Sequence, residues 1–193
     1  MKQIILATNN HHKLSEFRAM CEPLGIHVLS LKDLNIIVEI DETGATFAEN
    51  AIIKAETIAK LTQLPVFADD SGLAVDALDG APGVHSARFA GTHGDDAANN
   101  AKLLLELVAT PLAQRTARFV CVIAYAQPGQ PTQTFTGTCE GTIAFNTGGE
   151  SGFGYDPLFI PSGFTQTFAQ LSAAEKNQIS HRARALEQLQ TVL

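Results

Sequence analysis

The stretch PVFADDSGLAVDALDGAPGVHSARFAG (residues 65–91) begins with an apolar run that predicts a buried strand, and two adjacent carboxylates, Asp69 and Asp70, follow it directly. Two like charges at the end of a buried strand are costly unless a cation, a proton or a turn compensates them. Neighbouring side chains of a strand point to opposite faces, so we expect one carboxylate to face a cleft and the other to turn back into the protein. The alternative is a simple turn over residues 70–72, in which the aspartates act only as caps.

Strand and helix patterns alternate on both sides of this stretch. Apolar runs predict strands over residues 2–7, 26–31, 65–70, 118–126 and 132–144, the last two as an antiparallel pair across the turn QPGQP. Spacing near 3.6 residues predicts helices over residues 13–24, 46–62, 95–109 and from the Ser172–Glu175 capping box onward, either through Ser180 or with a new start there. Helices interleaved with lone and paired strands predict an α/β protein with a mixed sheet. No linker divides the sequence, so we expect a single domain over residues 1–193.

Composition and charge exclude several classes of protein. With 193 residues, 45% of them apolar and 17% charged, the chain has the profile of an ordinary globular protein rather than a disordered one. A net charge of −7 argues against nucleic acid as a partner, because binding a duplex needs a basic face. The apolar runs are too short for a signal peptide or a membrane span, and the three cysteines lack CxxC spacing. We therefore expect a cytoplasmic protein with free thiols and no membrane partner.

The polar segment TNNHHK (residues 8–13) joins the first predicted strand to the first predicted helix. A helix N-terminus with free backbone N–H groups can bind an anion, and Lys13 adds a charge that suits phosphate. An ordinary strand–helix turn with an exposed lysine is the alternative, because the segment lacks the glycines of a Walker loop.

Lys54 lies on the apolar side of the helix predicted over residues 46–62. A buried lysine needs an anion nearby, and the candidates are Glu49, Asp69 or a ligand phosphate. The carboxylates of Asp69 and Asp70 are hard oxygen ligands of the type that binds Mg²⁺ together with water and phosphate. The alternative for Lys54 is a purely structural ion pair.

A glycine-rich segment, SGFGYDP (residues 151–157), carries two aromatic side chains between glycines. If Phe153 and Tyr155 are exposed on a bendable loop, a nucleobase could stack on them. Further along the chain, donors for hydrogen bonds are offered by Lys176, His181 and Arg182. The alternatives are a packed aromatic hairpin and a solvated helix face.

Five motifs together resemble, in order and spacing, the RdgB/inosine triphosphatase family of noncanonical purine nucleoside triphosphate pyrophosphatases. They are ATNNHHKLSEF (7–17), ETGATFAENAIIKA (42–55), ADDSGLAVDALDGAPGVHSARFAG (68–91), GFGYDPLF (152–159) and AEKNQISHRARAL (174–186). The resemblance implies hydrolysis of ITP, dITP or XTP to the monophosphate and pyrophosphate, with Mg²⁺ required. It also implies an elongated, two-lobed mixed α/β fold with the active site in the cleft between the lobes, and a homodimer.

The resemblance further implies roles for particular residues. Asp70 and Glu42 are expected to hold Mg²⁺, and Asp70 to activate the attacking water. Lys13 and Lys54 are expected to counter the charge that grows on the phosphoryl oxygens. The expected substrate contacts are Thr8, Asn9, Asn10, His11, His12, Lys13, Ser71, Phe153, Gly154, Tyr155, Asp156, Lys176, His181 and Arg182. Donors among the last three of these would favour the 6-carbonyl of hypoxanthine and xanthine over the 6-amino group of adenine.

Other functions predict different behaviour. A Maf-like nucleotide pyrophosphatase has a similar cleft but acts on modified or pyrimidine nucleotides, so a substrate panel separates it. A nucleotide-binding sensor would need a defective acid or metal site, whereas Asp69, Asp70 and Glu42 are all present. A structural interaction protein would leave the buried lysine and the acidic pair unexplained.

Overall fold

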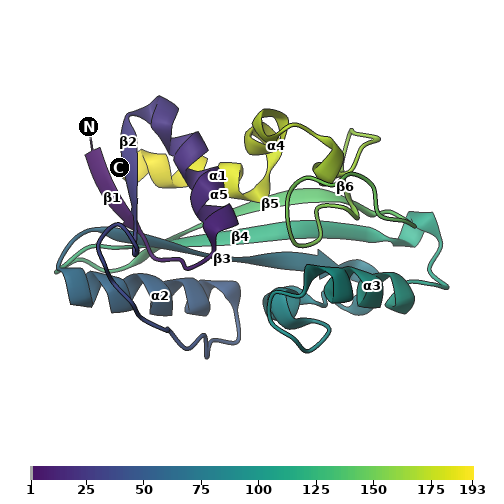
Figure 1. Cartoon of the computed structure of the whole chain (residues 1–193), viewed down its shortest axis with the longest axis horizontal. Helices are drawn as coiled ribbons and strands as arrows, with labels where there is room; N and C mark the ends of the chain where they lie inside the picture. Colours follow the sequence, from purple (N-terminus) through teal and green to yellow (C-terminus); the bar gives the residue numbers. More distant parts are fainter. Residues whose placement is uncertain (1) are drawn as a thin grey trace. The chain divides into compact units, whose positions relative to one another are not determined.

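The structure, a computed structural model, describes residues 2–193, which form an α/β fold with one mixed sheet (Figure 1). The strands are β1 (Lys2–Leu6), β2 (Ile26–Ser30), β3 (Val66–Val75), β4 (Thr116–Ala126), β5 (Gln133–Ile143) and β6 (Phe159–Pro161). The α-helices are α1 (His11–Cys21), α2 (Phe47–Thr62), α3 (Asp96–Glu106), α4 (Ala173–Ile179) and α5 (His181–Leu189). The predicted class is confirmed, because helices alternate with both lone and paired strands.

The strands are ordered β2-β1-β3-β4-β5-β6 across the sheet. β1 pairs in parallel with β2, where Ile4 lies opposite Val28, and in parallel with β3, where Leu6 lies opposite Phe67. β5 and β6 pair antiparallel, so the sheet is mixed. Parallel neighbours need a crossover segment, and α1 connects β1 to β2 while α2 precedes β3.

The residues fall into two compact units, and β3, β4 and β5 contribute residues to both. Unit 1 consists of the described residues up to Asp70 together with Cys121–Gly137 and Arg182–Leu193. Unit 2 consists of Ser71–Val120 and Thr138–His181. The expected functional residues are therefore divided between the units, and each unit is described separately below.

The core of unit 1 lies between the sheet and the helices α1 and α5. Phe17 of α1 and Leu186 of α5 are almost fully buried against strand side chains such as Ile4 and Phe67. The rings of Phe17 and Phe67 meet edge to face, with centroids 5.2 Å apart. This geometry is favourable for aromatic pairs and fixes α1 on the sheet.

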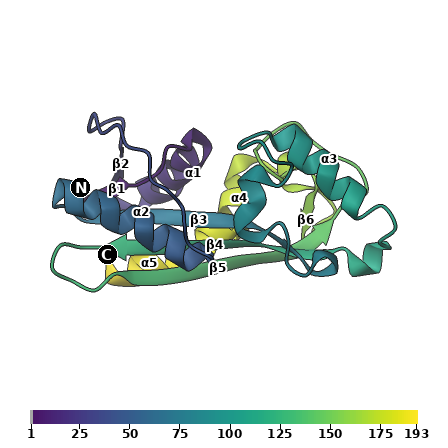
Figure 2. The same ribbon diagram turned by 90° about the horizontal axis from the view of Figure 1, so that it is seen from below.

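α2 covers the opposite face of this part of the sheet, as both views show (Figure 1, Figure 2). Ala51, Ala55, Ile58 and Ala59 form the buried stripe of this helix. Leu61, near the end of the helix, is 61% exposed and lies outside the stripe. The stripe carries Lys54 into the interior, which matters for the site described below.

Unit 2 has a core of its own, formed by α3, β6 and the adjoining parts of β3, β4 and β5. Leu103 and Leu107 at the end of α3 are fully buried there with an aromatic cluster of Phe119, Phe159 and Phe168. The ring centroids of Phe119 and Phe159 are 4.8 Å apart. α4 and the loop of residues 151–157, which carry several of the expected substrate contacts, also belong to this unit.

β3 is longer than expected and continues through the acidic pair to Val75. Leu73 and Val75 are fully buried, and the burial of alternate side chains keeps the chain extended beyond the aspartates. The turn considered over residues 70–72 is therefore wrong, because Asp69 and Asp70 lie inside the strand. Their side chains leave the strand on opposite faces.

The C-terminal helical region consists of two helices. Ser180 has extended backbone angles (φ −69°, ψ 160°), which end α4, and α5 begins at His181. The capping box predicted for Ser172 and Glu175 is present at the start of α4. A new start at Ser180 is thus the correct alternative of the two considered.

Arg115 is a buried cation in unit 2, with 1% of its surface exposed. Its guanidinium donates hydrogen bonds to the backbone carbonyls of Leu107, Thr110, Ile143 and Ala144. These carbonyls lie in the turn that follows α3 and at the junction where β5 ends, so one side chain ties the two segments together.

Arg115→Lys is expected to lower the free energy of unfolding by about 2–4 kcal/mol, because an ammonium cannot reach both segments and leaves buried carbonyls unpaired. Urea unfolding followed by circular dichroism measures the loss. Arg118→Lys is the matched control, since Arg118 makes exposed ion pairs with Asp76 and Glu140. Such pairs contribute at most about 1 kcal/mol. Equal losses in the two variants would contradict the role given to Arg115.

Two further expectations concern membranes and thiols. None of the helices in residues 2–193 combines the length and apolar character that crossing a bilayer demands. Cys21, Cys121 and Cys139 form no disulfide, as predicted, and all three are buried. Burial raises the pKa of Cys21 to about 11, so its reactive thiolate form is disfavoured.

Candidate active site

The N-terminus of α1 carries the segment expected to bind the triphosphate. Asn10 caps this helix: its Oδ1 accepts hydrogen bonds from the backbone N–H groups of His12 (2.9 Å) and Lys13 (3.1 Å). The N–H of Asn10 donates in turn to Thr8 Oγ1 (3.1 Å). The expectation of free N–H groups is therefore wrong for His12 and Lys13, because Asn10 already accepts from both. The side chains from Asn9 to His12 are exposed and Lys13 is partly exposed, so an anion can approach this end of α1.

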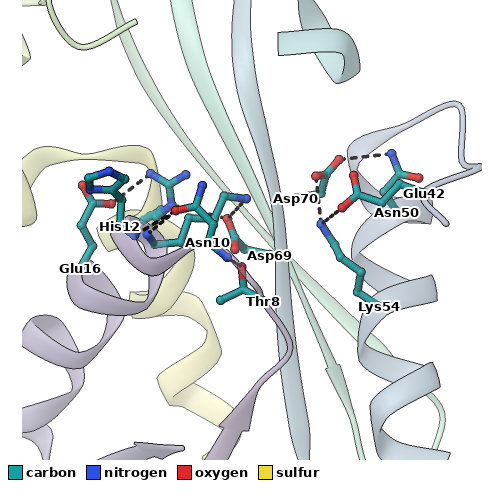
Figure 3. Close-up of polar contacts among 11 residues, drawn as sticks. Thr8, Asn10, His12, Glu16, Glu42, Asn50, Lys54, Asp69 and Asp70 are labelled. Carbon is teal, nitrogen blue, oxygen red and sulfur yellow. Dashed lines mark hydrogen bonds and ion pairs between the residues drawn. The ribbon is translucent and has the colours of Figure 1, made fainter. Parts of the chain in front are cut away.

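Asp69 lies at the centre of a buried charge cluster beside α1. Its side chain is fully buried, and its Oδ2 is 3.0 Å from Lys13 Nζ and 3.4 Å from Arg182 Nε. Arg182 also places Nη1 3.0 Å from Glu16 Oε2. Figure 3 shows this group on the α1 side of β3. Strand β3 and helices α1 and α5 thus each contribute charged groups that neutralise one another.

The pKa of Asp69 follows from this cluster. Burial alone would raise the pKa of Asp69, but the charges of Lys13, Arg182 and Lys54 outweigh it and hold the pKa well below its usual range. Asp69 is therefore ionised in the folded chain at neutral pH. Its contacts make it a structural anion that holds Lys13 and Arg182 in place.

Asp70 points to the other face of β3, as the alternation of a strand predicts (Figure 3). Its Oδ1 is 3.1 Å from Lys54 Nζ, and its Oδ2 accepts a hydrogen bond from Asn50 Nδ2 (3.3 Å). The same Lys54 Nζ is 2.9 Å from Glu42 Oε1. Two carboxylates, one from β3 and one from the loop before α2, therefore converge on a single ammonium.

Glu49, one of the anions expected to pair with Lys54, caps α2 instead. Its Oε2 accepts hydrogen bonds from the backbone N–H groups of residues 45 and 46 (2.7 and 3.0 Å). The carboxylates in contact with Lys54 are those of Asp70 and Glu42. The expected partner is thus corrected, while the expectation that Lys54 is buried and paired is confirmed.

The loop that carries Glu42 is held against the first turns of α2. Asn50 Oδ1 accepts a hydrogen bond from the backbone N–H of Gly44 (2.8 Å). A Cβ atom on Gly44 would lie 2.6 Å from the Cβ of Glu49 and 2.7 Å from Asn50 Oδ1, so only glycine allows this approach. Asn50 therefore connects both carboxylates, directly to Asp70 and through the loop to Glu42.

Around Lys54 there are more carboxylates than ammonium groups. Burial alone would lower the pKa of Lys54, but the carboxylates of Asp70, Asp69 and Glu42 outweigh it and raise the pKa. Burial raises the pKa of Asp70, and Glu42 raises it further, against the opposing effects of Lys54 and Lys13. Two carboxylates thus share one contacting ammonium, and a further cation would stabilise both in the ionised form.

These residues fit a divalent cation that takes most of its ligands from water and substrate. Asp70 and Glu42 present carboxylate oxygens to one point, which is the chemistry that Mg²⁺ uses when it is bound by one or two carboxylates. Among residues 2–193, no group of three or more His, Cys, Asp or Glu side chains is arranged to hold a metal. The two carboxylates would be supplemented by phosphate oxygens and water.

In unit 2, Asp156 and Lys176 form a buried ion pair, with 2.5 Å between Oδ2 and Nζ. The same Oδ2 accepts a hydrogen bond from the backbone N–H of Phe153 (2.9 Å). Lys176 Nζ lies 4.9 Å from the centre of the Phe153 ring. The glycine-rich loop and α4 thus bring three of the expected substrate contacts together.

Tyr155 and His181 are buried, which corrects part of the expectation for this region. Tyr155 is 3% exposed, and its hydroxyl donates a hydrogen bond to the carbonyl of Ser86 (2.8 Å). Its ring belongs to the core of unit 2, so it is not an exposed platform for a base. His181 is 2% exposed and stacks on Phe119 with centroids 4.7 Å apart. Of the two aromatic residues on the loop, only Phe153 is partly exposed.

The expected site residues form two groups, one in each unit. Unit 1 contains Thr8–Lys13, Glu42, Lys54, Asp70 and Arg182, and unit 2 contains Ser71, Phe153–Asp156, Lys176 and His181.

The sequence pattern does not single out Asn50 or Glu16 as site residues, although they contact Asp70 and Arg182. The one available signal was the position of Asn50 at the edge of the buried stripe of α2. No local pattern links Glu16 to a residue that follows 166 positions later.

Comparison with known proteins extends over nearly the whole chain. The sequence profile of the Ham1 family matches residues 4–192. A dITP/XTP pyrophosphatase from Bacillus licheniformis is 53% identical over 193 residues, covering 100% of this chain and 98% of the relative.

Solved structures agree with the sequence comparison. A HAM1 protein from Coxiella burnetii is 45% identical with a TM-score of 0.88, covering 100% of this chain and 98% of the other. A nucleoside-triphosphatase, also described as a dITP/XTP pyrophosphatase, from Mycobacterium abscessus is 46% identical with a TM-score of 0.78, covering 97% of this chain and 98% of the other. The similarity therefore includes both groups of site residues.

Proposed function

The chain belongs to the Ham1 family, and from this premise we propose that it hydrolyses the noncanonical purine nucleoside triphosphates ITP, dITP and XTP to the monophosphate and pyrophosphate. The observation that carries the proposal is the convergence of Glu42 and Asp70 on Lys54, with the Asp69–Lys13 pair on the other face of the same strand. Removal of these nucleotides from the pool would prevent their incorporation into DNA or RNA.

Hydrolysis at the α-phosphorus needs a base for the attacking water and positive charge for the phosphoryl oxygens. Asp70 is a suitable base, because burial raises its pKa and makes the carboxylate a better proton acceptor than an ordinary aspartate. Lys54 is already held against Asp70, and Lys13 is held at the N-terminus of α1. We assign the triphosphate to Thr8–Lys13, with both lysines opposing its charge.

Enzymes of this family generally need a divalent metal ion, and we propose Mg²⁺ held by Asp70 and Glu42. When bound, the ion would supply Lewis-acid stabilisation of the phosphoryl charge and acidify a bound water. The excess of negative charge around Lys54 supports a cation at this place. Asn50 would keep the two carboxylates oriented toward each other, through its bonds to Asp70 and to the loop of Glu42.

The base is assigned to the group in unit 2, with Ser71 as a further contact. Phe153 offers a ring face for stacking, and Lys176 is a donor that Asp156 holds in one position. His181 belongs to the same unit, and as donors Lys176 and His181 favour a carbonyl at position 6 of the purine over an amine. A site that reads a base through buried hydrogen bonds rejects the wrong base strongly, because its own polar groups are then left unpaired.

Pyrophosphate release from a panel of nucleotides tests the proposed function. ITP, dITP, XTP, GTP, ATP and dTTP are each incubated with Mg²⁺ or with EDTA. We expect pyrophosphate release only in the presence of the metal. The kcat/KM for hypoxanthine and xanthine nucleotides is expected to exceed that for ATP by at least about 100-fold. Preferential release from dTTP would instead favour a Maf-like activity, and binding without release would favour a sensor.

We also propose that the protein is a cytoplasmic homodimer. Both parts of the proposal rest on membership of the Ham1 family. Sedimentation equilibrium over a range of concentrations measures the oligomeric state, and a mass of one chain at every concentration would contradict the dimer.

A further inference from the structure

The glycine-rich loop (residues 146–157) contains no helix or strand, so isolated backbone hydrogen bonds and individual side-chain contacts hold it in place. Two of these contacts come from α3 and meet on one residue, Gly154. The backbone N–H of Gly154 donates to Asp96 Oδ2 (2.6 Å), and its carbonyl accepts from Asn100 Nδ2 (2.8 Å). Both polar groups of a single peptide residue are thus held by side chains four positions apart, on one face of one helix.

The contacts of the Asn100 side-chain amide fix its orientation. Its Nδ2 also donates to the carbonyl of Asp96 (2.8 Å), so both N–H bonds face carbonyl oxygens. The amide cannot turn over, because its oxygen would then face two acceptors. Asn100 Oδ1 is buried without a hydrogen-bond partner among the described residues. An unpaired buried oxygen costs free energy, whereas the two N–H bonds of the amide are both used.

Next to this contact the loop and the helix do not pack closely. A pocket of about 480 Å³ lies between them, lined on the helix side by Asp96, Asn100 and Leu104 and on the loop side by residues 149–154. The loop therefore has room to shift toward or away from α3. On the side that faces α3, the two hydrogen bonds to Gly154 rather than close apolar packing hold the loop against the helix.

The position of Gly154 bears directly on its neighbours in the loop. Phe153, one residue before it, carries the partly exposed ring above which Lys176 Nζ lies. Asp156, two residues after it, accepts from the Phe153 N–H and pairs with Lys176. A movement of Gly154 would thus change the ring, the carboxylate and the ammonium together.

We propose that Asp96 and Asn100 are positioning residues for base recognition: they hold Gly154 so that Phe153 and the Asp156–Lys176 pair present one fixed arrangement to the purine. The inference rests on the proposed function, which assigns the base to these residues. Neither positioning residue touches substrate in this account. Their effect is on how well the base is bound and distinguished, and the phosphate chemistry in unit 1 is left unchanged.

The test compares Asp96→Ala and Asn100→Ala with two neighbouring controls. Asp95→Ala removes the N-cap of the same helix, where Asp95 accepts from the Ala98 N–H, without touching the loop. Asn99→Ala removes a buried asparagine that bonds residues 87 and 90 instead of the loop. Each control thus removes a polar contact of α3 while both contacts to Gly154 remain.

We expect both test variants to raise KM for ITP by about tenfold and to reduce the ITP-to-GTP ratio of kcat/KM by at least about fivefold, with kcat for ITP within about twofold of wild type. Asp96→Asn keeps an oxygen that accepts from Gly154 and is expected to retain the wild-type ratio. Hydrogen exchange of peptides covering residues 146–157 should become faster in the test variants and stay unchanged in the controls.

The outcomes separate this inference from the proposed function. If the wild-type chain hydrolyses ITP, and the test variants have the same ITP-to-GTP ratio of kcat/KM as the controls, the inference is overturned and the proposed function stands. Unchanged hydrogen exchange in the loop overturns it as well, whatever the activity. If the wild-type chain hydrolyses no nucleotide in the panel, the proposed function fails and the role in base recognition fails with it. Faster exchange confined to the test variants would then show only that the two residues hold the loop.

Discussion

Asp70→Asn is expected to lower kcat for pyrophosphate release from ITP by about 10²–10⁴-fold, because an amide can neither take the proton of the attacking water nor replace a carboxylate beside a cation. Asparagine has nearly the same shape, its oxygen can still accept from Lys54, and Glu42 still pairs with that ammonium, so the main loss is the hydrogen bond from Asn50. The free energy of unfolding in EDTA is therefore expected to change by no more than about 1 kcal/mol. Steady-state kinetics and urea unfolding measure the two quantities on the same preparation.

Metal binding distinguishes the two roles that Asp70 could have. If Asp70 holds the ion, Asp70→Asn and Glu42→Gln should each weaken Mg²⁺ binding by at least about tenfold in calorimetry. If Asp70 acts only as the base, Asp70→Asn loses turnover with metal affinity unchanged, while Glu42→Gln still weakens binding. Turnover near that of wild type in Asp70→Asn would refute the assignment of Asp70 altogether.

Asp69→Asn is expected to lower the free energy of unfolding by about 3–5 kcal/mol, because it leaves Lys13 and Arg182 beside a buried neutral group. Asp69 is fully buried, and both cations contact its Oδ2. Urea unfolding at pH 7 measures the loss. Asp33→Asn is the matched control: Asp33 pairs with Arg18 at the surface, both side chains more than 40% exposed. The control is expected to lose at most about 1 kcal/mol.

The pH dependence of this difference has a definite sign. The pKa of Asp69 is lower in the folded chain than the ordinary value of about 4. Its contribution to stability is therefore fully present above that ordinary value and is lost as the pH falls through the depressed folded-state pKa. The difference between wild type and Asp69→Asn should be constant from pH 8 to about pH 5 and should shrink at lower pH. A difference that grows on acidification would contradict the structural role of Asp69.

The two variants make the same chemical change at adjacent positions, so each serves as a control for the other. Asp70→Asn should remove activity and keep stability, whereas Asp69→Asn should reduce stability first. Residual activity of folded Asp69→Asn is expected to exceed that of Asp70→Asn, because Asp69 acts through Lys13 and Arg182 rather than on the reacting atoms. If Asp69→Asn were the less active of the two variants, the assignment of the catalytic role to Asp70 and of the structural role to Asp69 would be contradicted.

Several features of the fold could be predicted because they depend on residues close together in the chain. The capping box at Ser172–Glu175 is a local pattern, and it is present. The helical stripe of residues 46–62 carried Lys54 into the interior, as its spacing indicated. The period of two along β3 was enough to predict that Asp69 and Asp70 point to opposite faces.

Predictions failed where the answer depends on what packs against a segment. Residues 70–72 have turn-forming composition, but the burial of Leu73 and Val75 keeps them in the strand. Tyr155 lies in a glycine-rich loop and was expected to be exposed, yet its ring packs in the core of unit 2 and its hydroxyl donates to the carbonyl of Ser86. In both cases tertiary packing outweighs a local preference of about 1 kcal/mol.

By itself the sequence determined the α/β class, the helix boundaries to within a few residues, the buried lysine and the separation of the two carboxylates. The tertiary structure alone decided which groups meet: Lys54 with Glu42 and Asp70 rather than Glu49, Arg182 with Glu16 and Asp69, and Gly154 with Asp96 and Asn100. Periodicity and capping arise from interactions within one or two turns of chain, so the sequence encodes them locally. Contacts between distant segments depend on how the whole core packs, because ion pairs and hydrogen bonds form only where that packing has already placed the side chains.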